Sequence, residues 1–207
     1  MTTIYLVRHG QSKSNLDKTF AGQKDVPLTE LGIKQAEVSA EKFRDFHFDK
    51  IYSSTLSRAY NTALPFAKQR GMDISQVSEL SETSLGDWEG KSIDDVRSEY
   101  EKWKGDIDYV IPNGESYRMM MMRVGKAIDK IANDNPDKIL LVASHGGCIR
   151  ALPAYFDNCN VELIYKTPIP SNLSVTKVVY ENGHGRIEEY AYDAYLGDMI
   201  TRFDNGN

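Results

Sequence analysis

Two apolar segments that lie far apart in the chain end in the same way. Residues 2–7 (Thr-Thr-Ile-Tyr-Leu-Val) run into Arg8-His9-Gly10, and residues 138–144 (Lys-Ile-Leu-Leu-Val-Ala-Ser) run into His145-Gly146-Gly147. Apolar runs without polar alternation are typical of strands buried on both faces, as in a parallel sheet covered by helices. Because ligands bind at the carboxyl edge of such sheets, both histidines are predicted to lie at a binding edge.

Helical and extended patterns alternate after the first of these strands. Thr29 is expected to cap a helix over residues 30–45, and residues 50–53 are expected to form a second strand. A helix capped by Ser54 or Thr55 follows, with a kink or an early end at Pro65, because proline removes a backbone N–H. The inward-facing residues of the two helices are expected to be Ile33, Ala36, Ala40 and Phe43, and Leu56, Ala59, Ala63 and Phe66.

The second half of the chain continues this pattern and ends it with a hairpin. Residues 76–80 are a candidate third strand, and a long helix is expected to follow residues 112–116. Residues 174–180 and 186–192 flank a turn sequence, which predicts an antiparallel edge. The expected fold class is therefore α/β: a single three-layer α/β/α domain over residues 1–207, with a mostly parallel central sheet and an antiparallel edge.

Two segments depart from the alternation. Residues 85–114 are richer in acidic and aromatic side chains and contain one short amphipathic helix, which Ser92 is expected to cap. This segment is predicted to be a small insert or lid over the site; a surface excursion without function is the alternative. Residues 199–207 are predicted to form a polar C-terminal tail.

The composition excludes several classes of protein. The net charge of −5 argues against a nucleic-acid-binding protein, which needs a basic face, so any anionic ligand must be held by local cations. No segment approaches 18 unbroken apolar residues, and no basic stretch with a long apolar run opens the chain, so membrane spanning and secretion are not expected. The expected location is cytoplasmic. Cys148 and Cys159 have no disulfide or zinc spacing and are expected to be packing residues.

Four side chains suited to an oxyanion follow three separate predicted strands. Arg8 and His9 follow the first, Arg58 lies in the first turn of the helix after the second, and His145 follows the strand at residues 138–144. In a parallel sheet these positions meet at one edge. Two guanidinium groups and two imidazoles there form a pocket suited to a phosphoryl group.

The motifs around these residues resemble those of the histidine phosphatase superfamily, which includes cofactor-dependent phosphoglycerate mutases. The resemblance covers most of the chain, and the order and spacing of the blocks make it specific. The matching blocks are Arg8-His9-Gly10 with Ser12 and Asn15; Ala21-Gly22; Pro27-Leu28-Thr29-Glu30-Leu31-Gly32 with Gln35-Ala36; Ser53-Ser54-Thr55-Leu56-Ser57-Arg58-Ala59 with Thr62-Ala63; Leu80-Ser81-Glu82; Gly86-Asp87-Trp88-Glu89-Gly90; Gly114-Glu115-Ser116; and Ser144-His145-Gly146.

This resemblance implies a mechanism through a phosphohistidine. His9 would attack phosphorus as a neutral imidazole, while Arg8, Arg58 and His145 would hold the equatorial oxygens. Glu82 would protonate the leaving alkoxide and then activate water. The further phosphate- or substrate-binding residues that we expect are Asn15, Gly10, Ser12, Ala21, Gly22 and Gly146. No metal and no cofactor are implied.

The expected activity is that of a phosphatase for a small phosphomonoester. Mutases of this family carry a basic, tyrosine-containing stretch after the acidic residue; here Thr83-Ser84-Leu85, Asp87 and Glu89 stand there, and Lys91 is the only nearby cation in the sequence. The alternatives are a phosphoglycerate mutase, which would need 2,3-bisphosphoglycerate as cofactor, and a catalytically silent module that binds a phospholigand. The sequence leaves open the physiological substrate, the oligomeric state and the role of residues 85–114.

Overall fold

The computed structural model describes residues 1–202, which form a six-stranded sheet with helices on both faces. The strand order is β3-β2-β4-β1-β5-β6. β1, β2, β3 and β4 are parallel, whereas β5 and β6 are antiparallel to their neighbours. The strands are β1 (Thr2–Arg8), β2 (Lys50–Ser53), β3 (Ile74–Gln76), β4 (Ile139–Ser144), β5 (Val175–Glu181) and β6 (His184–Tyr192).

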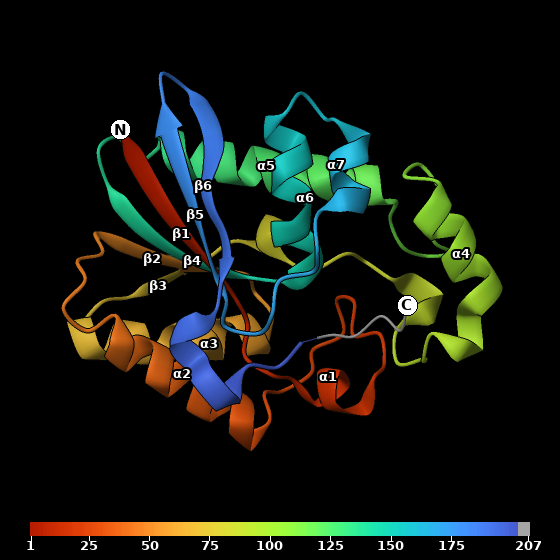
Figure 1. The fold of residues 1–207 in the computed structure, drawn as a ribbon, viewed down its shortest axis with the longest axis horizontal. Coiled ribbons are helices and arrows are strands. Elements are labelled where there is room, and N and C mark those ends of the chain that lie inside the picture. The colour runs from red at the N-terminus through yellow and green to blue at the C-terminus, as the bar shows by residue number, and fades with distance from the viewer. Residues whose placement is uncertain (203–207) are drawn as a thin grey trace.

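Helices cover the two faces of this sheet, as Figure 1 shows. α2 (Glu30–Lys42) and α3 (Ser57–Arg70) pack on one face, and α5 (Tyr117–Asn133) and α6 (Gly146–Phe156) pack on the other. Each face has its own cluster of buried apolar side chains, one around Phe66 and the other around Ile128. The predicted three-layer α/β/α arrangement with an antiparallel edge is therefore confirmed. The remaining helices are α1 (Lys13–Asp17), α4 (Arg97–Gly105) and α7 (Val161–Lys166).

The register of the two central strands places their ends side by side. Ile4 and Leu6 of β1 are fully buried, as are Leu140 and Val142 of β4, which explains the unbroken apolar runs. In the parallel ladder Arg8 is paired with Ser144, and the N–H of His9 donates to the carbonyl oxygen of Ser144 at 3.0 Å. His9 and His145 thus leave the sheet at the same edge.

Helix α2 begins as predicted, but two details differ. The Thr29 hydroxyl accepts a hydrogen bond from the N–H of Gly32 at 3.0 Å, which confirms the cap. The helix ends at Lys42 rather than at residue 45. Ile33, which was expected to face inward, is 50% exposed, because the buried stripe runs through Gly32, Gln35, Ala36, Ser39 and Ala40.

Helix α3 corrects two expectations. Leu56, not Ser54 or Thr55, stands at the N-cap without a side-chain hydrogen bond, because the Ser54 hydroxyl is engaged with His145. The helix also continues past Pro65 to Arg70. The residues after the proline include Phe66 and Ala67, which are buried against the sheet, and this packing offsets the lost backbone hydrogen bond.

The predicted third strand is shorter and lies earlier in the chain than expected. β3 covers Ile74–Gln76, and Ser78–Leu80 forms a 3₁₀ turn. The turn brings the carbonyl oxygen of Leu80 to the end of β4, where it accepts a hydrogen bond from the Ser144 hydroxyl at 2.8 Å. This backbone path carries residues 81–84 over the edge where His145 leaves the sheet.

Residues 85–114 extend beyond the three layers, with α4 lying at the side of the molecule in Figure 1. They have their own buried apolar cluster, formed by Leu85, Trp88, Val96, Tyr100 and Ile111. The Ser92 hydroxyl accepts the N–H of Asp95 at 3.3 Å, but that bond stands at a 3₁₀ turn (Asp94–Val96), so Ser92 does not cap α4, which begins only at Arg97. This segment packs as a unit beside the edge that carries the histidines.

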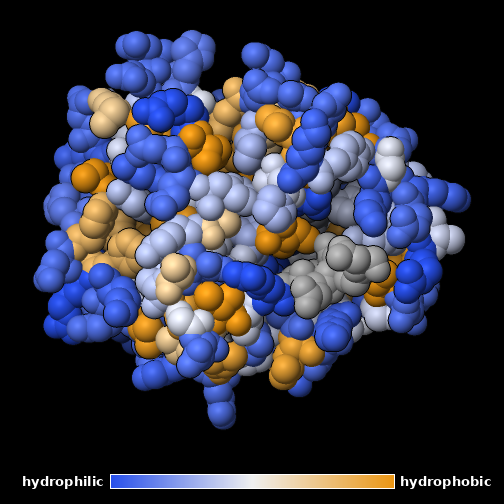
Figure 2. All heavy atoms as spheres, in the orientation of Figure 1, coloured by the Kyte–Doolittle hydropathy of each residue, from blue (hydrophilic) through white to orange (hydrophobic). Residues whose placement is uncertain are grey.

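The start of the predicted tail packs against α2. The Gln35 side-chain amide donates to the carbonyl oxygen of Met199 at 2.7 Å and to the Thr201 hydroxyl at 3.0 Å. Residues 203–207 of that prediction lie outside the described residues. Over residues 1–202, no helix has the length and apolar character needed to cross a bilayer. Figure 2 shows a largely hydrophilic face with small, scattered apolar patches.

Candidate active site

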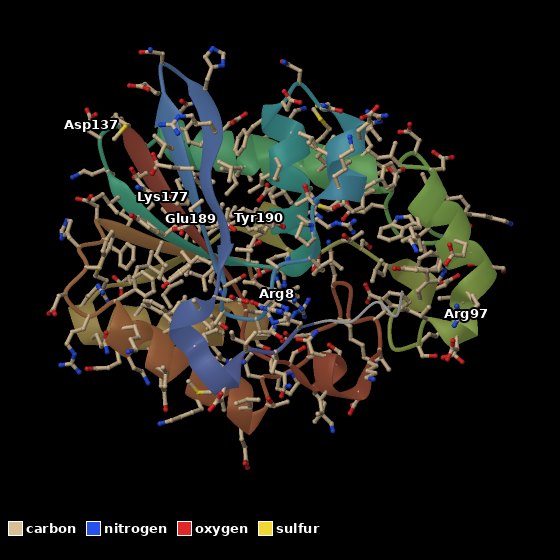
Figure 3. The ribbon with its side chains drawn as sticks, in the orientation of Figure 1. Arg8, Arg97, Asp137, Lys177, Glu189 and Tyr190 are labelled. Carbon is tan, nitrogen blue, oxygen red and sulfur yellow. The ribbon has the colours of Figure 1, made fainter. Side chains whose placement is uncertain are left out.

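The ends of β1 and β4 bring the two histidines into contact. The ring centroids of His9 and His145 lie 5.2 Å apart. His9 is 4% exposed and His145 is fully buried. Arg8 lies in the interior in Figure 3, at the end of the sheet, whereas Arg97 and Asp137 lie at the periphery. A pocket opens at this edge, and Arg8, His9, Arg58 and Glu82 all line it.

The local backbone fixes which nitrogen of His9 is free to react. Nδ1 lies 2.7 Å from the carbonyl oxygen of Gly10, which can only accept a hydrogen bond, so Nδ1 carries the proton and Nε2 keeps its lone pair. Burial lowers the pKa of His9 well below the ordinary value of 6.5, and the charges of Arg58 and Arg8 lower it further. His9 is therefore a neutral imidazole at neutral pH, with Nε2 available as a nucleophile.

Two buried guanidinium groups lie beside His9 without a carboxylate partner among residues 1–202. Arg58 donates to the carbonyl oxygens of Gly22 at 2.7 Å and Lys24 at 3.0 Å, and Arg8 donates to that of Pro170. The Nε atom of each arginine is buried with no partner in the described structure. Burial lowers the pKa of Arg8 to about 10 and also lowers the pKa of Arg58, so both remain charged at neutral pH. An anion in the pocket would neutralise this buried charge.

His145 is held by a hydroxyl and has one ring nitrogen without a partner among the described residues. Its Nε2 lies 2.7 Å from the Ser54 hydroxyl, and its Nδ1 is buried without a hydrogen-bond partner among the described residues. Burial, followed by the charge of Arg58, lowers the pKa of His145 well below 6.5. Helix α6 begins at the next residue, so its first backbone N–H groups also face this edge.

Glu82 lies across the pocket at the N-terminus of α6. Its Oε2 accepts the N–H of Gly147 at 3.1 Å, and its Oε1 accepts the N–H of Thr83 at 3.0 Å. The segment that carries Glu82 is held by Arg123, whose Nη1 donates to the carbonyl oxygens of Glu79 at 2.7 Å and Ser81 at 2.9 Å. A carboxyl group is thereby placed opposite the two arginines.

The predicted phosphate-binding residues divide into two groups. Asn15, Ala21, Gly22 and Gly146 line the pocket with Arg8 and His9. Asn15 Oδ1 accepts hydrogen bonds from the Ser12 N–H at 3.1 Å and from Asn172 Nδ2 at 3.2 Å, which turns the Asn15 amide N–H₂ away from these partners.

Gly10 and Ser12, the other two predicted phosphate-binding residues, do not line the pocket. A Cβ atom on Gly10 would come within 2.5 Å of the carbonyl oxygen of Gly32, so the turn after His9 accepts only glycine without displacement of the backbone. Ser12 is fully buried and caps α1 through its hydroxyl. Both residues shape the loop that carries Asn15.

Two residues at the site were not anticipated from the sequence, Arg150 in the pocket lining and Asn172 behind His9. Arg150, on α6, lines the pocket, whereas Lys91, the cation that stands near Glu82 in the sequence, is exposed and does not line it. Asn172 donates to the carbonyl oxygen of His9 at 2.8 Å. Arg150 could have been found, because it stands four residues after Gly146 and so shares a helix face with it. Asn172 follows no strand or motif, so no local pattern indicates it.

Comparisons with known proteins agree with this geometry. The family model described as "Histidine phosphatase superfamily (branch 1)" matches residues 4–193. The chain is 28% identical over 200 residues to the uncharacterized phosphatase PhoE of Bacillus subtilis, covering 97% of this chain and 100% of PhoE. It is 34% identical over 182 residues to the probable phosphoglycerate mutase GpmB of Escherichia coli, covering 79% of this chain and 85% of GpmB.

A solved structure shows the same fold with an anion bound. Mycobacterial glucosyl-3-phosphoglycerate phosphatase, solved in complex with VO3, superposes with a TM-score of 0.84 at 26% identity and covers 92% of this chain and 99% of that one. The sheet topology, the histidine pair at its edge and the match over nearly the whole chain lead to one conclusion. The chain belongs to branch 1 of the histidine phosphatase superfamily and is a hydrolytic phosphatase.

Proposed function

We propose that this phosphatase hydrolyses small phosphomonoesters and that His9 Nε2 is the atom that accepts the phosphoryl group. In the first step the N–P bond forms while the bond from phosphorus to the ester oxygen breaks. In the second step water attacks phosphorus, the N–P bond breaks, and phosphate and free His9 are released. The observation that carries this proposal is the neutral His9, whose Nδ1 proton is committed to the Gly10 carbonyl, beside two buried guanidinium groups whose Nε atoms have no partner among residues 1–202.

Arg8, Arg58 and His145 would stabilise the transferring phosphoryl group. Each has a buried N–H donor with no partner among residues 1–202, so no existing hydrogen bond must break when the anion enters. Donors fixed in this way are typically worth about 3–4 kcal/mol each in the transition state. The Asn15 amide and the first N–H groups of α6 would add neutral hydrogen bonds.

Glu82 would serve as general acid and then as general base. It lines the pocket, and it would give its proton to the leaving oxygen in the first step and take a proton from water in the second. Such proton transfer contributes about 10²–10⁴-fold to the rate. The two guanidinium groups supply the positive charge that the reaction needs, so we propose that no metal or other cofactor takes part.

The second candidate activity is that of a phosphoglycerate mutase, which the 34% identity to GpmB favours. A mutase would keep the dephosphorylated product in the pocket and would need 2,3-bisphosphoglycerate to prime His9. The absence of Lys91 from the pocket lining weakens this alternative, and Arg150 is the cation that a mutase would have to use. A silent phospholigand-binding module is the third candidate, and it would form no phosphoenzyme.

A steady-state assay separates these candidates. The phosphatase should release inorganic phosphate continuously from p-nitrophenyl phosphate, and His9→Ala should abolish the release. Interconversion of 2- and 3-phosphoglycerate that is much faster than phosphate release would identify a mutase. Binding of inorganic phosphate without any turnover by the wild-type protein would identify a silent module.

We also propose a cytoplasmic location. The support for this proposal is that Cys148 and Cys159 are both free, because disulfides are rare in the reducing cytosol.

A further inference from the structure

The active-site pocket shares a wall with a second pocket. Tyr100, Trp103, Tyr117 and Arg150 line both of them. The second pocket continues towards α7 and is also lined by Lys104, Ile107, Ile164 and Tyr165. The leaving group of a phosphomonoester bound at His9 therefore has room to extend along this shared wall, away from the phosphoryl site.

The shared wall is aromatic. The ring centroids of Tyr100 and Trp103 lie 5.9 Å apart, and those of Trp103 and Tyr117 lie 5.7 Å apart. Phe20 extends the row on the active-site side, 5.7 Å from Tyr100. A continuous aromatic surface favours a planar or otherwise apolar body over a compact polar one.

Two polar groups on this wall lack hydrogen-bond partners. The Tyr117 hydroxyl and the Trp103 indole N–H are buried without hydrogen-bond partners among residues 1–202. Tyr117 as a whole is only 5% exposed. Leaving such groups unpaired is unfavourable, and a ligand that accepts their hydrogen bonds removes this cost. Burial raises the pKa of Tyr117, so its hydroxyl remains a neutral donor.

Arg150 adds a free positive charge to the same wall. Its Nε donates to the carbonyl oxygen of Thr167 at 2.8 Å, which fixes the plane of the guanidinium group, and no carboxylate of the described residues forms a salt bridge with it. The residues that line the second pocket include Lys104 and no aspartate or glutamate. Every charged group along this pocket is therefore a cation.

We propose that Tyr117, Trp103 and Arg150 form a second subsite, which binds a carboxylate at the far end of an apolar, preferably aromatic, leaving group. This inference rests on the proposed function and names the substrate class of the same site. A carboxylate could pair with the Arg150 guanidinium and accept hydrogen bonds from the two neutral donors on the same wall. A cationic end would face Arg150 and Lys104, and a purely apolar end would leave the two neutral donors unpaired.

The test measures binding separately from turnover. In the His9→Ala variant, titration calorimetry compares phenyl phosphate, 3- and 4-carboxyphenyl phosphate, and 4-carbamoylphenyl phosphate, which has the same shape as the 4-carboxylate but no charge. We expect at least one carboxylate to bind about 10-fold or more tightly than phenyl phosphate, with the carbamoyl compound between them. Tyr117→Phe and Arg150→Met, each added to the His9→Ala variant, should lower the ratio of the affinities for the carboxylate and for phenyl phosphate to about 1.

Matched controls remove equivalent groups elsewhere. Tyr155→Phe deletes a hydroxyl that donates to Asp129 on α5, and Arg118→Met deletes a guanidinium that pairs with Asp108; neither residue lines the two pockets. Both control variants should keep the preference for the carboxylate. Loss of the Tyr117 hydroxyl breaks no hydrogen bond within the described chain, so Tyr117→Phe should also fold.

Equal affinity for all four compounds, or a preference that survives both Tyr117→Phe and Arg150→Met, would overturn the subsite. Tighter binding of the carbamoyl compound than of either carboxylate would also overturn it, because the subsite would then prefer a neutral end group to a carboxylate. The wild-type protein tests the proposed function by release of phosphate from the same compounds. A protein that shows the carboxylate preference in His9→Ala but releases no phosphate would keep the subsite and refute hydrolysis.

Discussion

The Ser54 hydroxyl lies 2.7 Å from Nε2 of His145, and its oxygen also accepts the N–H of Leu56 at 3.3 Å. We propose that the hydroxyl donates its proton to Nε2 of His145 while its oxygen accepts from Leu56. In that arrangement His145 carries its own proton on Nδ1, the buried atom without a partner among the described residues. Ser54 would then be a positioning residue, which selects the tautomer of His145 that can donate to a phosphoryl oxygen.

We predict that Ser54→Ala lowers kcat about 10-fold and that Ser54→Thr, which keeps the hydroxyl, restores most of the loss. The reason is that His145 without Ser54 distributes its proton between both nitrogens. Nitrogen-15 NMR of the imidazole should show the Nδ1–H tautomer in the wild type and a mixture in Ser54→Ala. A lower rate with an unchanged tautomer would mean that Ser54 has only a packing role.

Glu82→Gln should slow the hydrolysis of alkyl phosphates by about 10²–10⁴-fold and that of p-nitrophenyl phosphate much less. The reason is that p-nitrophenolate leaves without a proton, whereas an alkoxide needs one. The measurement is the dependence of kcat/KM on the pKa of the leaving alcohol, which should become steeper in the variant. Equal losses for good and poor leaving groups would show that Glu82 is not the acid.

Arg123→Met should produce the same steepening in a milder form. Arg123 donates to the backbone carbonyl oxygens of Glu79, Ser81 and Glu82 and forms a salt bridge with Glu115. The Glu115 carboxylate also accepts the N–H of Ser84 at 2.8 Å. Without this clamp the carboxyl group of Glu82 loses its fixed position. Breaking a largely buried pair should also lower the free energy of unfolding by about 3 kcal/mol. Arg118→Met, on the same helix, is the control and should leave the leaving-group dependence unchanged.

The two buried histidines predict how stability depends on pH. In the folded state the pKa values of His9 and His145 both lie well below 6.5, so between these values and 6.5 the unfolded chain binds more protons. The stabilisation is complete above pH 6.5 and is lost as the pH falls below it, by up to about 1.4 kcal/mol per histidine per pH unit. Urea unfolding at pH 5.0 and 6.5 should show this loss, and it should be smaller in His9→Ala and in His145→Ala. An identical slope in these variants would contradict the buried, neutral state.

Gly10→Ala should lower both stability and activity. A Cβ at this position would lie 2.5 Å from the Gly32 carbonyl oxygen, so the backbone that holds Nδ1 of His9 must shift. We expect a loss of about 1–3 kcal/mol in the free energy of unfolding and a fall in kcat of at least about tenfold. Gly105→Ala is the control, because a Cβ there meets no heavy atom within 4 Å. Calorimetric melting and p-nitrophenyl phosphate turnover measure the two effects.

The layers and the strand ends could be predicted from the sequence because they depend on local patterns. The runs that form β1 and β4 are mostly apolar, and neighbouring parallel strands end at one edge of the sheet, which places His9 near His145. The predicted hairpin likewise follows from a turn sequence between two alternating segments. These local patterns do not predict the path of the loops that cross that edge.

The wrong predictions concern positions whose structure depends on contacts between residues far apart in the sequence. Ser54 was expected to cap a helix, but its hydroxyl is taken by His145, 91 residues away in sequence. A kink or an early end of α3 was expected at Pro65, and the early end is wrong, because burial of the following turn maintains the helix. Arg150 could have been placed on the same helix face as Gly146, but its closeness to the aromatic wall depends on how residues 85–114 pack, and composition does not reveal that packing.

The most direct test of the central claim is to quench the enzyme during turnover of a phosphorus-32-labelled monoester and to locate the label. The account predicts an acid-labile, base-stable phosphohistidine on His9, bonded through Nε2, in the wild type and none in His9→Ala. Turnover by the wild type with no labelled protein, or with the label on any other residue, would contradict it.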